Sequence, residues 1–178
     1  WLIGIGFLSV LAGWFYTGGK TPYGYRGLGE VSVFVFFGLV ATAGSAFVQI
    51  ETFSGLAIVS SIPVGFLAMA LLMINNLRDI ETDRETDKRT LAVLLGAKRT
   101  QNLFLFLVFS SVTLYCFFSF FSSLLALLVL ASLPLCAQIL RLVRKDMSSQ
   151  MHIKVLELTA KLHMISGGLY AAGLWIGL

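Results

Sequence analysis

Charged residues are scarce in this chain of 178 residues, because Asp, Glu, Lys and Arg together make up only 12% of it. A soluble domain of this length carries about a quarter charged residues. The deficit is concentrated in long uncharged runs, and runs of about 20 apolar residues are long enough to cross a bilayer as helices. The sequence therefore excludes an ordinary soluble domain and predicts an all-α integral membrane protein.

Cysteine and proline are also rare, with two and three copies respectively. Cys116 and Cys136 both lie inside apolar runs without metal-ligand spacing, which argues against a disulfide framework or a cysteine-based metal site. Pro63 and Pro134 lie inside apolar runs as well, where we expect each to kink a helix.

The chain has neither an initiator Met nor a charged N-terminal flank, and Trp1 already belongs to an apolar run. A signal peptide would begin with a basic segment. We therefore expect an N-terminally incomplete piece of a longer protein, with residues 1–178 forming a single transmembrane domain.

Six apolar segments are separated by polar or turn-forming connectors. The segments are residues 1–16, 31–50, 56–74, 103–120, 124–140 and 158–178. Each is close to the length of a membrane-spanning helix, apart from the first. The sequence predicts a bundle of six transmembrane helices with no sheet.

The basic residues are confined to alternate connectors. All 13 Lys and Arg residues fall in residues 17–30, 75–102 and 141–157, if Lys161 is counted with the last of these. The positive-inside rule places these three connectors on the cytoplasmic side of the membrane. The same rule explains the net charge of +4 without a nucleic-acid partner.

The stretch 75–95, NNLRDIETDRETDKRTLAVLL, holds five of the nine acidic residues. If the preceding helix continues, Asn76, Asp79 and Asp83 stand at i, i+3 and i+7 on one helical face. Crowded carboxylates repel each other unless a cation lies between them. Mg²⁺ prefers carboxylate oxygens and fills its other positions with waters and substrate phosphates. One interpretation is a metal-diphosphate site at a membrane surface.

A solvated connector is the alternative interpretation, because four basic residues are interleaved with these acids. Lys88 would then pair with Glu85, and Arg78 with Glu81, at helical spacing. The glycine-rich connector TGGKTPYGYRGLGE at 17–30 matches neither a Walker loop nor a dinucleotide fingerprint. Its Tyr and Arg residues either cap a cavity or lie at the membrane interface.

Two stretches resemble the UbiA superfamily of intramembrane prenyltransferases, and within it the branch acting on 1,4-dihydroxy-2-naphthoate in menaquinone biosynthesis. Residues 75–96 resemble the second aspartate-rich motif of that branch, and PYGYRGLGE at 22–30 resembles its other characteristic loop. The positions in register are Asn75, Asn76, Arg78, Asp79, Asp83, Arg84, Lys88 and Thr90 to Val93. Asp87 departs from the pattern, because relatives often carry glycine there.

The resemblance implies a nine-helix bundle, of which the six segments here correspond to the last six, and the first aspartate-rich motif is missing. It also implies a Mg²⁺-dependent enzyme that transfers a polyprenyl group from polyprenyl diphosphate to 1,4-dihydroxy-2-naphthoate. Diphosphate and CO₂ would leave as demethylmenaquinone forms. The alternatives are a prenyltransferase with another aromatic acceptor and a non-catalytic membrane carrier with an acidic gate.

The resemblance assigns a role to each candidate residue. Asn76, Asp79 and Asp83 are the expected metal ligands, and Asp79, Asp83 and Lys88 the expected catalytic residues. The expected substrate-binding residues are Asn75, Arg78, Arg84, Tyr23 and Arg26.

Overall fold

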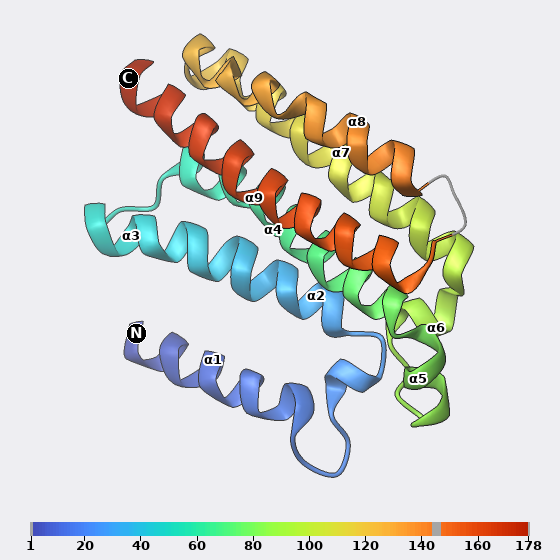
Figure 1. Cartoon of the computed structure of the whole chain (residues 1–178). Helices are drawn as coiled ribbons and strands as arrows, with labels where there is room; N and C mark the ends of the chain where they lie inside the picture. The colour runs from blue at the N-terminus through green and yellow to red at the C-terminus, as the bar shows by residue number, and fades with distance from the viewer. Residues whose placement is uncertain (1, 144–146, 178) are drawn as a thin grey trace.

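A computed structural model describes residues 2–143 and 147–177, and nearly all of this part of the chain is helical (Figure 1). The elements are α1 (Leu2–Thr17), η1 (Tyr23–Tyr25), α2 (Gly29–Val33), η2 (Phe34–Ala43), α3 (Gly44–Ile50), α4 (Gly55–Arg78), α5 (Ile80–Glu85), α6 (Leu91–Leu95), α7 (Ala97–Ser122), η3 (Leu124–Ser132), α8 (Leu133–Val143) and α9 (Ser149–Gly177). Within these described ranges, the only β-type pairing is an isolated bridge between Arg26 and Arg89. The prediction of an all-α protein without a sheet is confirmed.

The long helices run side by side along one common direction (Figure 1). Two are composite, because α2, η2 and α3 join into Gly29–Ile50 while η3 and α8 join into Leu124–Val143. These two, with α4 and α7, are the four helices in the described residues that are long and apolar enough to cross a membrane. The helix α1 has only 16 residues, and α9 carries Lys154, Glu157 and Lys161. The prediction of six membrane spans is therefore not confirmed.

Two of the predicted polar connectors are shorter than the composition indicated. The helix α4 continues to Arg78 and α7 already begins at Ala97, while α8 extends to Val143 and α9 begins at Ser149. Polar residues are accommodated in the end turns of these helices, because helix ends are fixed by caps and turns as well as by polarity. Pro134 is the second residue of α8, where the chain changes from a 3-10 helix to an α-helix.

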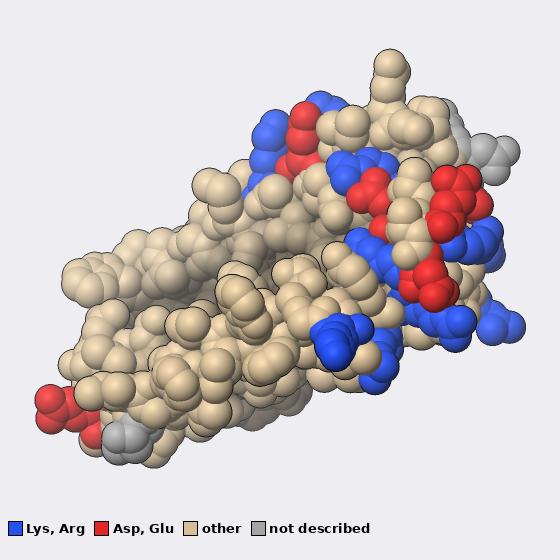
Figure 2. All heavy atoms as spheres, turned by 90° about the horizontal axis from the view of Figure 1, so that it is seen from below, with Lys and Arg blue, Asp and Glu red and all other residues tan. Residues whose placement is uncertain are grey.

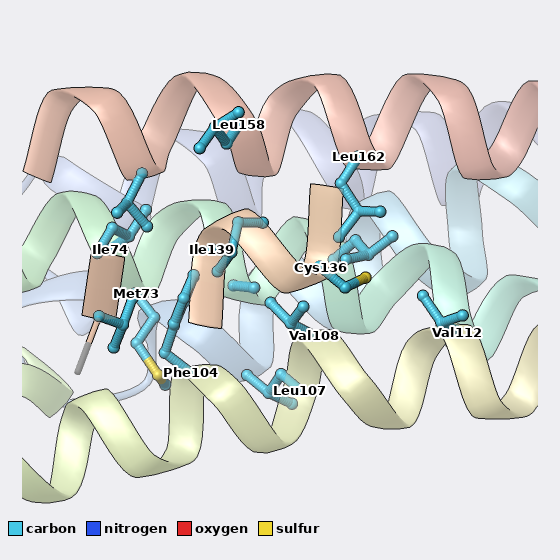
Figure 3. Close-up of a cluster of buried hydrophobic side chains, with 14 of the residues drawn as sticks. Met73, Ile74, Phe104, Leu107, Val108, Val112, Cys136, Ile139, Leu158 and Leu162 are labelled. Atoms are coloured by element: carbon cyan, nitrogen blue, oxygen red, sulfur yellow. The ribbon is translucent and has the colours of Figure 1, made fainter. Parts of the chain in front are cut away.

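The hydrophobic core lies where α4, α7, α8 and α9 face one another (Figure 3). Its fully or nearly fully buried side chains include Met73, Ile74, Phe104, Leu107, Val108, Ile139, Leu158 and Leu162. Along α4 the buried apolar residues Leu67, Ala70, Met73 or Ile74, and Leu77 are three or four positions apart, so that they fall on one face. The core fixes α4, from whose end the acidic stretch projects.

Two glycines bring the helix Gly29–Ile50 into close contact with α4. A β-carbon on Gly38 would lie 2.7 Å from the Gly65 Cα, and one on Gly65 would lie 2.6 Å from a ring carbon of Phe34. Small residues at a helix crossing permit such close approach of two backbones. This contact holds the beginning of α2 beside the end of α4.

The charged side chains gather at one end of the molecule, around the acidic stretch (Figure 2). This end contains the connector before α2, the elements α5 and α6, and the start of α9. Glu51 lies at the opposite end, directly after α3. The described residues of the three basic connectors thus lie at one end of the molecule, as the charge pattern predicted.

Candidate functional site

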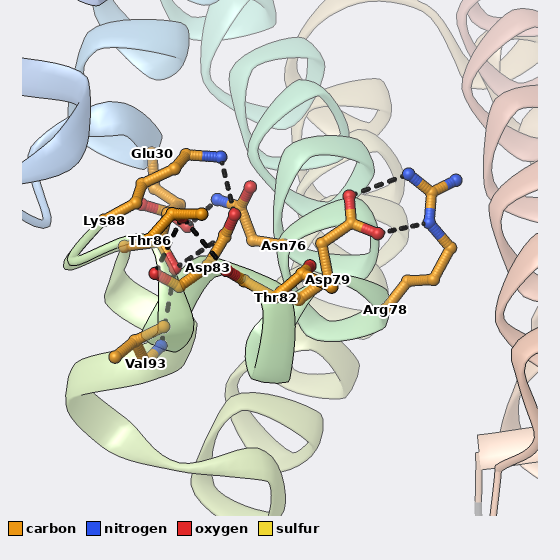
Figure 4. A network of polar contacts seen from close by, with 10 residues as sticks. Glu30, Asn76, Arg78, Asp79, Thr82, Asp83, Thr86, Lys88 and Val93 are labelled. Atoms are coloured by element: carbon orange, nitrogen blue, oxygen red, sulfur yellow. Dashed lines mark hydrogen bonds and ion pairs between the residues drawn. The ribbon is translucent and has the colours of Figure 1, made fainter.

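The acidic stretch is not a continuation of α4 as one straight helix. The α-helix ends at Arg78, and Asp79 has φ −95° and ψ 10° before α5 begins at Ile80. The assumption behind the i, i+3, i+7 spacing is therefore wrong at Asp79. In the tertiary structure the Asp79 carboxylate bonds Arg78, whereas the Asp83 carboxylate bonds Lys88 (Figure 4).

Asp83 lies at the buried centre of the polar cluster, with 6% of its surface exposed. Its carboxylate accepts a hydrogen bond from the Lys88 ammonium at 3.0 Å and one from the Thr90 hydroxyl at 3.4 Å. The Lys88 N–H also donates to the Asp83 carbonyl at 2.8 Å. The chain reverses between them with Asp87 at φ 54°, a left-handed conformation that favours glycine. This turn brings Lys88 back onto Asp83 in place of the expected helical pairing with Glu85.

Asp79 is bound by its own neighbour. The Arg78 guanidinium donates to both oxygens of the Asp79 carboxylate, at 2.7 and 2.8 Å, and about a third of each side chain is exposed. The hydrogen bonds from Arg78, together with the positive charge of Lys88, lower the pKa of Asp79. Asp79 is therefore held ionised, and its carboxylate points away from Asp83 (Figure 4).

Asn76 meets a residue to which sequence reasoning gave no role. The Asn76 amide group donates to the Glu30 carboxylate at 3.0 Å, and both side chains are buried. The second oxygen of Glu30 is buried with no hydrogen-bond partner in the described residues. An acidic residue at the entry to a membrane helix is itself a signal of function, and this signal would have identified Glu30.

The glycine-rich connector contacts the turn of the acidic stretch. The Lys88 ammonium lies 5.4 Å from the centre of the Tyr25 ring, and the Arg89 N–H donates to the Tyr25 carbonyl at 3.1 Å. Cation–π attraction and the backbone bond together join the two segments. Arg26 lines a cavity of about 460 Å³ beside Arg89, at the edge of the cluster.

Tyr23 lies on the other side of the connector. Its hydroxyl donates to the Ala12 carbonyl at 2.9 Å and lies 3.0 Å from the Ser32 hydroxyl. Both Tyr23 and Ser32 line a cavity of about 590 Å³ between α1 and η2, whose remaining walls are mostly apolar. Tyr23 is thus a polar group on an apolar cavity, separate from the Asp83 cluster.

Arg84 and Asn75 lie outside the buried cluster. Arg84 donates to Glu81 at 3.0 Å, and both side chains are mostly exposed, whereas the solvated-connector interpretation paired Glu81 with Arg78. The carbonyl of Asn75 accepts the N–H of Asp79 at 3.2 Å at the end of α4. Of the predicted site residues, the structure brings Asn76, Asp83 and Lys88 together around Glu30 (Figure 4).

The donor set of this cluster is chemically suited to a hard divalent cation. No group of three or more His, Cys, Asp or Glu side chains capable of holding a metal occurs in the described residues. Mg²⁺, however, is commonly bound through one or two carboxylates, with waters and substrate phosphates in its other positions. Asp83 and Asn76 supply oxygens of the required kind.

These features define a multi-pass helical membrane protein with a buried polar cluster at one charged end of an apolar bundle. Residues 1–165 match the UbiA prenyltransferase family, and the chain belongs to this family.

The chain is similar to 1,4-dihydroxy-2-naphthoate octaprenyltransferases from two bacteria. It is 46% identical to that of Mycobacterium tuberculosis over 104 residues, which are 58% of this chain and 36% of the relative. It is 38% identical to that of Escherichia coli over 174 residues, which are 97% of this chain and 56% of the relative. It is also 31% identical to UbiA prenyltransferase domain-containing protein 1 of Danio rerio over 159 residues, 89% of this chain and 46% of that relative. The chain spans between about a third and just over half the length of these curated relatives.

Proposed function

We propose that the full-length protein transfers a polyprenyl group from an allylic diphosphate to 1,4-dihydroxy-2-naphthoate. The observation that carries this proposal is the likeness along 97% of the chain to the Escherichia coli 1,4-dihydroxy-2-naphthoate octaprenyltransferase. The buried cluster of Asp83, Lys88 and Asn76 at the charged end supports it, because a diphosphate requires both cations and a water-poor site for departure.

Asn76, Asp79 and Asp83 are the proposed ligands of Mg²⁺. When bound, Mg²⁺ would offset the negative charge that grows on the departing diphosphate. Lys88 adds a fixed positive charge beside Asp83 for the same purpose. Asp79 is directed to Arg78 in the structure, so its participation requires the carboxylate to turn or to bind through a water.

Arg78, Arg84, Arg26, Asn75 and Tyr23 are the proposed substrate-binding residues. The arginines supply forked donors suited to diphosphate or carboxylate oxygens. Tyr23 and the apolar cavity of about 590 Å³ between α1 and η2 suit an isoprenoid chain with a polar group at one end.

The reaction balances without an added oxidant. The C–O bond of the allylic diphosphate breaks, and its electron pair leaves with the diphosphate. A C–C bond forms between the allylic carbon and the ring carbon that bears the carboxylate. The electron pair of the C–CO₂ bond then returns to the ring as CO₂ departs. The product is the diol whose oxidised form is demethylmenaquinone.

We place the protein in the bacterial cytoplasmic membrane with residues 17–30, 75–102 and 141–157 on the cytoplasmic side. The confinement of Lys and Arg to these connectors supports this orientation. A diphosphate substrate made in the cytoplasm would then meet the charged end directly.

The test is an assay of the purified full-length protein in lipid with labelled polyprenyl diphosphate and Mg²⁺. Dihydroxynaphthoate is expected to give prenylated product and diphosphate in equal amounts, with turnover lost on chelation of the metal. Product with 4-hydroxybenzoate alone would assign another acceptor. Failure to release diphosphate with any aromatic acceptor would instead favour a carrier.

A further inference from the structure

Glu30 is a buried acidic residue without a role in the proposed reaction. It lies in the first turn of α2 with only 1% of its surface exposed. One carboxylate oxygen accepts the Asn76 amide at 3.0 Å, and the other is buried without a partner in the described part of the chain. A buried carboxylate with one oxygen left without a hydrogen bond costs free energy. Stability alone therefore does not account for Glu30.

The contact with Glu30 fixes which way round the Asn76 side chain lies. The NH₂ group of the Asn76 amide faces Glu30 and donates to one of its carboxyl oxygens. The oxygen and the NH₂ group of an amide point in different directions, so the Asn76 oxygen does not face Glu30, and Asn76 belongs to the same polar network as Asp83 (Figure 4). No described residue donates a hydrogen bond to that amide oxygen.

The Asp83 carboxylate has positions left for a cation. A carboxylate has about four lone-pair sites, and Asp83 accepts only the bonds from Lys88 and Thr90 among the described side chains. A divalent cation bound between Asp83 and the Asn76 oxygen would use those positions.

We infer that Glu30 is a positioning residue that holds the Asn76 amide oxygen toward a divalent cation shared with Asp83. The inference rests on the proposed function only in taking Asn76 as a ligand of the cation. Groups that orient a metal ligand from behind commonly alter metal affinity or activity by about 10- to 100-fold when they are removed.

The experiment measures Mn²⁺ affinity of the full-length protein in lipid by electron paramagnetic resonance, with inorganic diphosphate present. Glu30→Met removes the acceptor and keeps a long unbranched side chain, and it is expected to weaken Mn²⁺ binding by about 10-fold or more. Glu30→Gln keeps a carbonyl that accepts the same hydrogen bond, so its affinity should stay within about three-fold of the unsubstituted protein. Glu51→Met, at the other end of the same helix, is the matched control and should change nothing.

A second substitution separates positioning from a purely structural role. Asn76→Asp places a carboxylate at position 76, and both of its oxygens bind a cation equally well, so its orientation no longer matters. The double variant Glu30→Met with Asn76→Asp should therefore bind Mn²⁺ at least as tightly as Asn76→Asp alone. A structural defect caused by Glu30→Met would persist in the double variant.

Three results would overturn the inference. The first is an Mn²⁺ affinity of Glu30→Met equal to that of the unsubstituted protein. The second is a loss of Mn²⁺ affinity in Glu30→Gln as large as that in Glu30→Met. The third is a double variant that binds Mn²⁺ as weakly as Glu30→Met. If Glu30→Met is not recovered as monodisperse protein, Glu30→Ala serves in the same comparisons.

The outcome is independent of the organic acceptor. Glu30-dependent Mn²⁺ binding in a protein that prenylates no dihydroxynaphthoate would leave the inference standing and refute the proposed acceptor. Unchanged Mn²⁺ binding in Asn76→Ala would refute both the metal assignment of Asn76 and the inference.

Discussion

The acidic residues of the stretch 75–95 differ in environment more than their spacing indicated. Asp83 is buried and bonded to Lys88 and Thr90, and Asp79 is about one-third exposed and bonded to Arg78. Asp87 is exposed and sits in a left-handed turn conformation. These environments predict different consequences for the three carboxylates.

We expect Asp83→Ala and Asp79→Ala each to lower Mg²⁺-dependent turnover of the full-length protein by about 100-fold or more, since each removes a proposed ligand of the metal. Asp87→Gly should leave turnover nearly unchanged. It should also raise the melting temperature slightly, because a left-handed conformation costs a non-glycine residue about 1 kcal/mol. Initial rates over a Mg²⁺ titration and thermal unfolding check these effects.

Near-normal turnover in both alanine variants would show that the metal assignment is wrong. A severe loss in Asp87→Gly would identify a third carboxylate ligand that the resemblance does not supply.

At the scale of helices, the site depends on how closely Gly29–Ile50 packs on α4. The contact at Gly38 and Gly65 sets the distance between the two helices, and with it the reach from Glu30 to Asn76. Tight crossings leave little room for extra volume.

Gly38→Ala is expected to destabilise the full-length protein by about 1–3 kcal/mol, because the new methyl group would overlap the α4 backbone. Gly44→Ala is the matched control in the same continuous helix, since a β-carbon there meets no atom within 4 Å. Thermal unfolding in lipid measures the difference between the two. Equal melting temperatures would show that the two helices separate at little cost, and that the crossing does not hold Glu30 in place.

At the scale of the whole molecule, charge divides the bundle into two ends. The basic connectors and the polar cluster share one end (Figure 2), and Glu51 follows α3 at the other end. This division predicts the orientation of the protein in its membrane.

The orientation is testable by cysteine labelling after Cys116 and Cys136 are replaced by alanine. A membrane-impermeant maleimide applied to intact cells should label Glu51→Cys. Lys20→Cys and Lys98→Cys, both at exposed positions of the charged end, should react with the maleimide only after the cells are permeabilised. Labelling of Lys98→Cys in intact cells would place the polar cluster on the outer side and contradict a cytoplasmic site.

Much of the fold could be predicted from the sequence because membrane helices are specified locally. Long apolar runs, confined basic residues and the absence of strand patterns indicated a helical membrane bundle and its polar end. The predicted number of six membrane spans was not confirmed, since α1 is short and α9 carries charges that lower its hydropathy. The motif at 75–96 located the candidate site, although it did not reveal how its residues pair.

By itself, the sequence determined that this is a helical membrane protein and where its acidic stretch lies, because both depend on the local order of apolar and charged residues. Only the tertiary structure decided that Lys88 bonds Asp83, that Asp79 turns to Arg78, and that Glu30 meets Asn76. The last contact joins residues 46 positions apart in the chain. It depends on the packing of two helices across a pair of glycines, and no local pattern in the sequence encodes that distance.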